Sequence, residues 1–247
     1  MSAGFLRSEQ RALAHNAASA LRIGGLTALS TTDYPGQLSA VVFCQGCPWR
    51  CGYCHNPHLL ARRSNDEIAW KSIIAFLDRR RGLLDAVVFS GGEPTLQTGV
   101  AEAMREVRQM GFRVGLHTAG IYPRRLRTLL PLVDWVAMDI KTSFAAYASV
   151  TGRQKSGKNA FDSMQLILAS GVDHEFRTTV HPGLLSQDSL AALAQRLAQL
   201  GVRRYVLQEF RAQGCASDGF HGVPSYLTDS FLQSMAPLFP ALSVRRA

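Results

Sequence analysis

The chain has 247 residues, a net charge of +9 and 47% hydrophobic residues, which is enough apolar material for one substantial core. It contains no apolar run of the roughly 18 or more residues that a membrane span needs, and no linker or repeat divides it. We therefore expect no membrane association and a single domain over residues 21–247. The positive charge permits an acidic protein partner, whereas the dispersal of the basic residues argues against nucleic acid.

Residues 1–20 are rich in alanine and serine, with scattered charges and no helix caps. They predict a loosely ordered N-terminal extension and lack the apolar segment of a secretory signal. The five cysteines are an odd number. Together with the missing signal, this favours a reducing, cytoplasmic location over a disulfide framework.

Apolar strands alternate with helical patterns along the rest of the chain. Strand 38–43 precedes helix 66–80, 86–89 precedes 98–110, and 113–116 precedes 123–130. Strand 135–138 then precedes helix 161–169, 175–180 precedes 189–200, and 205–208 precedes 228–238. Helix-ending glycines stand at Gly111, Gly171 and Gly201. The six units predict an α/β fold with a parallel sheet, as either a doubly wound open sheet or an incomplete (β/α)6 barrel.

Cys47, Cys51 and Cys54 form a C-x3-C-x2-C cluster on the loop after the first predicted strand. Thiolates this close together serve a local purpose and can hold one small inorganic centre. Three is one ligand short of the four that a cubane iron–sulfur cluster uses, so one iron would stay open to a small molecule. A zinc site that adds Cys44 is disfavoured, because structural zinc sites usually separate their cysteine pairs by about a dozen residues. We expect Cys44 to pack under the loop.

Polar and glycine-rich segments follow the other predicted strands at the same end, where parallel α/β folds gather their chemistry. These segments are Ser90–Pro94, His117–Gly120, Asp139–Lys141 and Arg177–Gly183. Gln208 and Arg211, after the sixth strand, are further candidates to face the same pocket. We expect His117 to be a core or rim histidine and Cys215 an ordinary half-buried thiol.

The cysteine cluster, with Tyr53 before its last cysteine, resembles the hallmark of the radical S-adenosylmethionine (SAM) enzymes. Residues 91–94 are similar to the family's GGEP motif, residues 139–141 to the D-[IL]-K motif of its glycyl-radical-enzyme activases, and Thr118 with Gly120 to its T-x-G turn. The resemblance implies an incomplete barrel that holds one [4Fe–4S] cluster on Cys47, Cys51 and Cys54. We expect Glu93 to brace its loop more than to touch the ligand. The SAM-binding set implied by the resemblance is Tyr53, Gly91, Gly92, Glu93, Thr118, Asp139, Lys141 and Arg177.

The segment from Gly24 to Pro57 is similar to the activating proteins of anaerobic ribonucleoside-triphosphate reductase, a group close to the pyruvate formate-lyase activases. The resemblance implies reductive cleavage of SAM and formation of a glycyl radical on that reductase, with a flavodoxin- or ferredoxin-type protein as the reductant. Cys54 and Gly91 are too close in sequence for an inserted two-cluster domain. The alternatives are an activase of a pyruvate formate-lyase-type enzyme, a radical SAM enzyme for a small molecule or nucleobase, and a metal-binding protein without catalysis.

Overall fold

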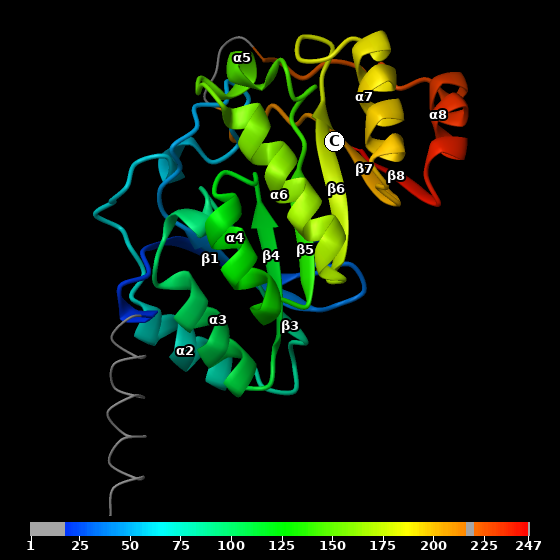
Figure 1. Cartoon of the computed structure of the whole chain (residues 1–247). Helices are drawn as coiled ribbons and strands as arrows, with labels where there is room; N and C mark the ends of the chain where they lie inside the picture. The colour runs from blue at the N-terminus through cyan, green and yellow to red at the C-terminus, as the bar shows by residue number, and fades with distance from the viewer. Residues whose placement is uncertain (1–17, 216–219, 247) are drawn as a thin grey trace, which may run out of the picture.

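The computed structural model describes residues 18–215 and 220–246, and one sheet of eight strands runs through them in chain order (Figure 1). Residues 1–17 of the predicted extension therefore lie outside the described residues. Ala18, which is described, is buried in the core. Strands β2 to β8 are parallel, and β1 pairs antiparallel with β2. The strands are β1 (Ile23–Ser30), β2 (Ser39–Cys44), β3 (Ala86–Gly91), β4 (Arg113–Thr118), β5 (Trp135–Asp139), β6 (Asp173–Val180), β7 (Arg204–Glu209) and β8 (Ala241–Arg245).

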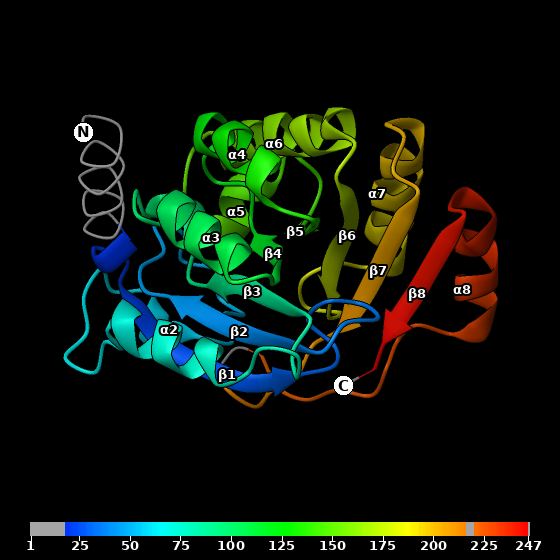
Figure 2. The same ribbon diagram turned by 90° about the horizontal axis from the view of Figure 1, so that it is seen from below.

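The helices cover the outer face of the curved sheet, and Figure 2 shows the strands arching inside them. Because β1 and β8 are the two ends of the strand order and do not pair, the barrel is incomplete. This decides between the two architectures that the sequence left open. The helices are α2 (Trp70–Asp78), α3 (Val100–Gln109), α4 (Pro123–Leu129), α5 (Tyr147–Thr151), α6 (Ser156–Ser170), α7 (Gln187–Gln199) and α8 (Asp229–Met235).

All six predicted strand–helix units are present, with ends that differ by a few residues. The strands are rich in β-branched residues such as Val87 and Val88, which are fully buried. Ser186 caps α7 by accepting a hydrogen bond from the Ser189 backbone, and Thr228 caps α8 in the same way. The three predicted helix-ending glycines all have positive φ.

The sequence pattern did not predict strands β1 and β8 or the short helix α5. The first contains Gly24 and Gly25 and is only partly buried along most of its length. The second has five residues, none of them buried. Both are edge strands, so neither shows the continuous apolar run by which a strand covered on both faces is recognised.

A second, smaller cluster of buried residues fills the inside of the arch. Tyr34, from the loop between β1 and β2, stacks on Trp135 with ring centroids 5.0 Å apart. That loop lies within the arch in Figure 2. Because this loop and its neighbours occupy the amino ends of the strands, the space that remains open lies at their carboxyl ends.

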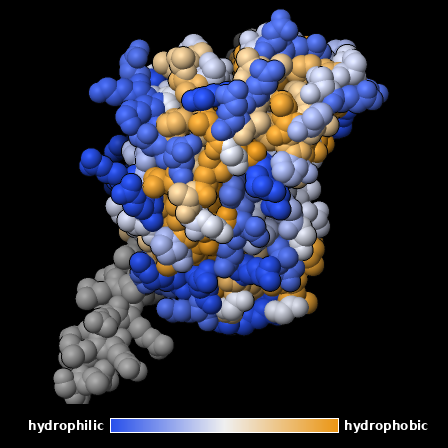
Figure 3. Space-filling model, turned by 45° about the vertical axis from the view of Figure 1, so that its right-hand side comes forward, coloured by the Kyte–Doolittle hydropathy of each residue, from blue (hydrophilic) through white to orange (hydrophobic). Residues whose placement is uncertain are grey.

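The surface in Figure 3 shows hydrophobic residues in a band between hydrophilic regions. The large hydrophobic side chains most exposed in the described part of the chain are Leu29, Leu38, Leu83 and Val223. No helix in that part combines the length and the apolarity that crossing a membrane requires.

Candidate functional site

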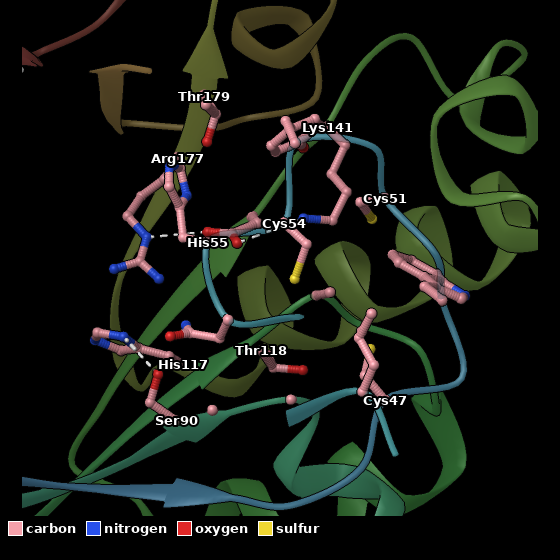
Figure 4. Close-up of a pocket in the computed structure, with 18 residues that line it drawn as sticks. Cys47, Cys51, Cys54, His55, Ser90, His117, Thr118, Lys141, Arg177 and Thr179 are labelled. Atoms are coloured by element: carbon pink, nitrogen blue, oxygen red, sulfur yellow. Dashed lines mark hydrogen bonds and ion pairs between the residues drawn. The ribbon is translucent and has the colours of Figure 1, made fainter. Parts of the chain in front are cut away.

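A pocket lies at the carboxyl ends of β3 to β6, beneath the loop that carries the three cysteines (Figure 4). It brings together every residue of the expected cluster-binding and SAM-binding sets except Glu93. Its lining also contains residues that the sequence reading had not assigned a role. The complete lining is Cys47, Trp49, Cys51, Tyr53, Cys54, His55, Asn56, Leu60, Ser90, Gly91, Gly92, His117, Thr118, Ala119, Asp139, Lys141, Arg177 and Thr179.

The base of the cysteine loop is joined directly to the glycine pair after β3. The Gly92 amide donates to the Cys44 carbonyl at 2.9 Å, and the Glu93 amide donates to the Gly46 carbonyl at 2.9 Å. A Cβ on Gly91 would lie 2.4 Å from the Cys44 nitrogen, and one on Gly92 would lie 2.4 Å from the Gly46 oxygen. In the structure it is the backbone of the cysteine loop that leaves no room for a side chain.

The rest of the cysteine loop is held by two further segments. The Cys47 amide donates to the Leu60 carbonyl at 3.2 Å, and the Arg50 amide donates to the Thr151 carbonyl at 2.9 Å. The Trp49 ring packs edge-on against Tyr147 of α5. These contacts fix the backbone while the three sulfur atoms face a common space in Figure 4.

The three thiols line one pocket without converging as the ligands of a single ion would. No group of three or more His, Cys, Asp or Glu side chains in the described ranges 18–215 and 220–246 could hold one ion. A cubane cluster needs no such convergence, because each thiolate binds a different iron. Burial raises the pKa of Cys47 to about 12 and also raises the pKa of Cys51. A metal centre held by these thiols would therefore have to displace their protons. Cys44 is fully buried and off the pocket, which confirms its expected packing role.

A charged group forms the wall opposite the cysteines. Asp139 and Arg177 are direct partners in the β5–β6 register, and Arg177 Nε donates to Asp139 Oδ1 at 3.2 Å. Lys141 Nζ lies 3.6 Å from Asp139 Oδ2 and 5.3 Å from the centre of the Tyr53 ring. The Lys141 side chain is only 10% exposed, so its ammonium group is largely shielded from solvent and faces the pocket.

Burial and mutual attraction have opposite effects on these charges. Burial opposes ionisation of Asp139, but Arg177 and Lys141 hold the pKa of its carboxyl below the ordinary value. Burial likewise opposes the charge on Lys141, yet its acidic neighbours raise its pKa well above the usual range. Because burial raises the pKa of Tyr53 and of Cys51, both are neutral near pH 7, and the carboxylate of Asp139 is the charge that matters there.

Glu93 braces the site from behind and does not line it. Its side chain is fully buried, and Oε1 accepts hydrogen bonds from the Thr95 hydroxyl at 2.6 Å and the Thr118 hydroxyl at 2.8 Å. Oε2 accepts from the Ala119 amide at 2.9 Å. The GGEP loop and the T-x-G turn are thus tied together by one carboxylate, as the expected bracing role requires.

His117 is a rim histidine, and its environment involves a loop that the sequence reading did not assign to the site. Its Nε2 donates to the Asp33 carbonyl at 2.7 Å, so Nδ1 can accept from the Ser90 hydroxyl at 3.4 Å. Burial and the nearby Arg177 hold the pKa of His117 well below its ordinary value, and the ring is neutral near pH 7. Thr179 also lines the pocket. It lies two residues after Arg177 on β6, and side chains two residues apart on a strand point to the same face, so the sequence pattern could have predicted it.

Three further expectations had mixed outcomes. Gln208 and Arg211 do not line the pocket, so the prediction that they face it is wrong. The Arg211 guanidinium instead donates to the Arg246 carbonyl at 3.2 Å. Cys215 is half-buried as expected, but it is next to the cysteine loop, where its Sγ lies 3.7 Å from the Gly52 carbonyl oxygen.

Residues 41–205 match the sequence model of the Radical SAM superfamily, which covers more than half of the chain. The chain belongs to the radical SAM superfamily. A Methanocaldococcus jannaschii protein named as a glycyl-radical enzyme activating enzyme is 30% identical over 82% of this chain and 85% of its own length. The pyruvate formate-lyase-activating enzyme of Clostridium pasteurianum is 30% identical over 70% of this chain and 74% of its own. The resemblance to glycyl-radical-enzyme activases is thereby confirmed.

Solved structures of this superfamily share the fold. Streptococcus suis SuiB bound to S-adenosylmethionine superimposes with a TM-score of 0.62 at 12% identity over 82% of this chain and 48% of that one. The protein anSMEcpe with bound AdoMet gives a TM-score of 0.60 at 13% identity over 81% and 59% of the two chains. The chain thus spans about half the length of these two proteins.

The Asp139 cluster predicts a pH-dependent contribution to stability. Because the folded pKa of Asp139 is lowered, its stabilising effect is present above the unfolded pKa of about 4 and is lost as the pH falls through the folded value. Asp139→Asn should lower the free energy of unfolding at pH 7 by about 1–3 kcal/mol, a value reduced for its partial exposure. The deficit should shrink below about pH 4. Urea unfolding at several pH values measures both effects.

The matched control is Asp162→Asn, which removes the exposed pair with Lys158. It should change stability by less than about 0.5 kcal/mol. An Asp139→Asn protein as stable as the Asp162→Asn protein at pH 7 would show that the buried network contributes nothing.

Proposed function

We propose that this pocket holds one [4Fe–4S] cluster on Cys47, Cys51 and Cys54 together with SAM, and that the protein installs a glycyl radical on a partner enzyme. The observation that carries the proposal is the arrangement of three thiols around one space, opposite the Asp139–Lys141–Arg177 group. When bound, the cluster would supply the electron that cleaves SAM into methionine and a 5′-deoxyadenosyl radical.

The side chains around the pocket suit the two ends of SAM. Lys141 and Arg177 offer cationic donors to a carboxylate, and Asp139 offers an acceptor to an ammonium or a ribose hydroxyl. The Tyr53 ring provides a flat apolar surface for a base. Both cations already have a partner in Asp139, which keeps them in place before the ligand arrives.

The proposed partner is a protein whose glycine-bearing loop enters the pocket. The described residues form the barrel, its helices and short connections, and no further domain that would enclose a small substrate is seen among them. Two curated relatives are named as activating enzymes. We propose anaerobic ribonucleoside-triphosphate reductase as the partner because of the segment from Gly24 to Pro57, with a pyruvate formate-lyase-type enzyme as the alternative.

Electron paramagnetic resonance tests this function directly. Anaerobically reconstituted protein is mixed with each glycyl radical enzyme of its host, with SAM and with dithionite. A glycyl doublet should appear with the reductase and should need both SAM and reductant. A doublet with a formate-lyase-type enzyme alone would change the partner, and 5′-deoxyadenosine without any protein radical would point to a small-molecule substrate.

Lys141 is predicted to bind SAM and not the metal. Lys141→Ala should leave about four irons per chain, while SAM binding measured by calorimetry weakens roughly ten- to a hundredfold through loss of a charge-assisted contact. The exposed Lys158→Ala variant is the control and should bind SAM like the unmodified protein. Equal affinities in the two variants would exclude Lys141 from the SAM site.

A further inference from the structure

One side of the cysteine loop carries positive charges that no carboxylate of the described residues pairs with. Arg50, Arg153 and Lys155 are exposed, and none of them has an acidic partner among the residues that the structure describes. The sequence has no Asp or Glu between positions 34 and 65 or between 140 and 161. Together, Arg50, Arg153 and Lys155 form the basic face.

The basic face is built onto the cluster-binding segment. Arg50 directly precedes Cys51, and its guanidinium donates to the Cys47 carbonyl at 2.6 Å. Arg153 Nε donates to the Pro48 carbonyl at 2.9 Å. The connection between α5 and α6 is thereby joined to the outer side of the loop whose sulfur atoms face the pocket, and Figure 1 shows α5 beside this loop at one end of the barrel.

Lys155 has a backbone conformation that lysine rarely adopts. Its φ is 61° and its ψ is 4°, and every other positive-φ residue in the described part of the chain is glycine. A side chain in the left-handed region costs free energy that glycine would avoid. Among the residues that the structure describes, the Lys155 side chain takes part in no hydrogen bond or ion pair that would offset this cost. Backbone strain that no local contact compensates is typical of residues whose side chain has a function.

We propose that the basic face is the docking surface for an acidic one-electron donor protein of the flavodoxin or ferredoxin type. The inference rests on the proposed function, because such a donor is needed only if the pocket holds a cluster. The donor protein loses one electron and the cluster site gains it; no covalent bond forms or breaks. Arg50 and Arg153 bond the backbone of the segment that carries the thiols, so a docked donor would be near the acceptor without entering the SAM pocket.

The position of the face favours this donor over the glycyl radical partner. A glycine Cα must come into contact with the reacting nucleoside, so its loop has to enter the pocket beside Lys141 and Arg177. An electron donor only needs to come close. Opposite charges bring two proteins together faster and orient them, and this effect is strong at low salt.

Binding of a reduced flavodoxin to the reconstituted protein tests the proposal. At low ionic strength Lys155→Glu should weaken the complex roughly three- to tenfold by calorimetry, and the difference should disappear near 0.5 M salt, where exposed charges are screened over about 4 Å. Arg203→Glu is the matched control. It makes the same change in charge at an exposed position just before β7, at the opposite end of the strands, and should stay within about twofold of the unmodified protein.

The Lys155→Gly variant removes the positive charge of the side chain without destabilising the fold. It should bind flavodoxin less tightly than the unmodified protein and yet unfold at a higher temperature, because glycine relieves the strained backbone. Its SAM cleavage should be slower with flavodoxin and unchanged with dithionite, which needs no docking surface. Failure of cleavage with dithionite in the unmodified protein would reject the proposed function, while the binding comparison would still be readable.

Three outcomes would contradict the proposal that the basic face is a docking surface. Equal weakening by Lys155→Glu and Arg203→Glu would mean that only the overall charge matters. Unchanged flavodoxin binding in both Lys155 variants would exclude the face. Unchanged flavodoxin binding with weaker binding of the glycyl radical enzyme would assign the face to that partner.

Discussion

The site depends on one close contact between two backbones, at the point where β2 and β3 end. The Gly91–Glu93 segment donates two backbone hydrogen bonds to the Cys44–Gly46 segment, and the two backbones lie too close for a Cβ on Gly91 or Gly92. Parallel strands that are neighbours in the sheet bring these two loops together. The base of the cysteine loop is therefore part of the sheet, because Cys44 is the last residue of β2 and pairs with Gly91 of β3.

The other walls of the pocket are tied to this contact by polar groups from successive strands. Glu93 carries the connection to the turn after β4 through Thr118 and Ala119. Asp139 and Arg177 then join β5 to β6, and Lys141 returns to the cysteine loop above Tyr53. Each strand end thus contributes a group that is fixed by its neighbour before any ligand binds. Such preorganisation would lower the cost of placing the proposed SAM against the proposed cluster.

The sequence predicts what depends on local pattern and fails where distant segments meet. Buried parallel strands are continuous apolar runs, so β2 to β7 and the functional residues at their ends could be predicted. Edge strand β1, with its two glycines, gives no such run. The role of Gly92 is set by a carbonyl of Gly46, and the environment of His117 is set by Asp33, both far away in sequence. No local pattern contains that information.

The central claim is that the glycine pair and the cysteine loop form one unit, and the iron content of a Gly92→Ala variant tests it most directly. The substitution adds a Cβ that would lie 2.4 Å from the Gly46 oxygen, whereas Gly25→Ala would meet nothing closer than 3.6 Å. After anaerobic reconstitution, the Gly25→Ala protein should hold as much iron as the unmodified chain, and the Gly92→Ala protein should hold clearly less. Full loading of the Gly92→Ala protein, with an unchanged midpoint of thermal unfolding, would contradict the account.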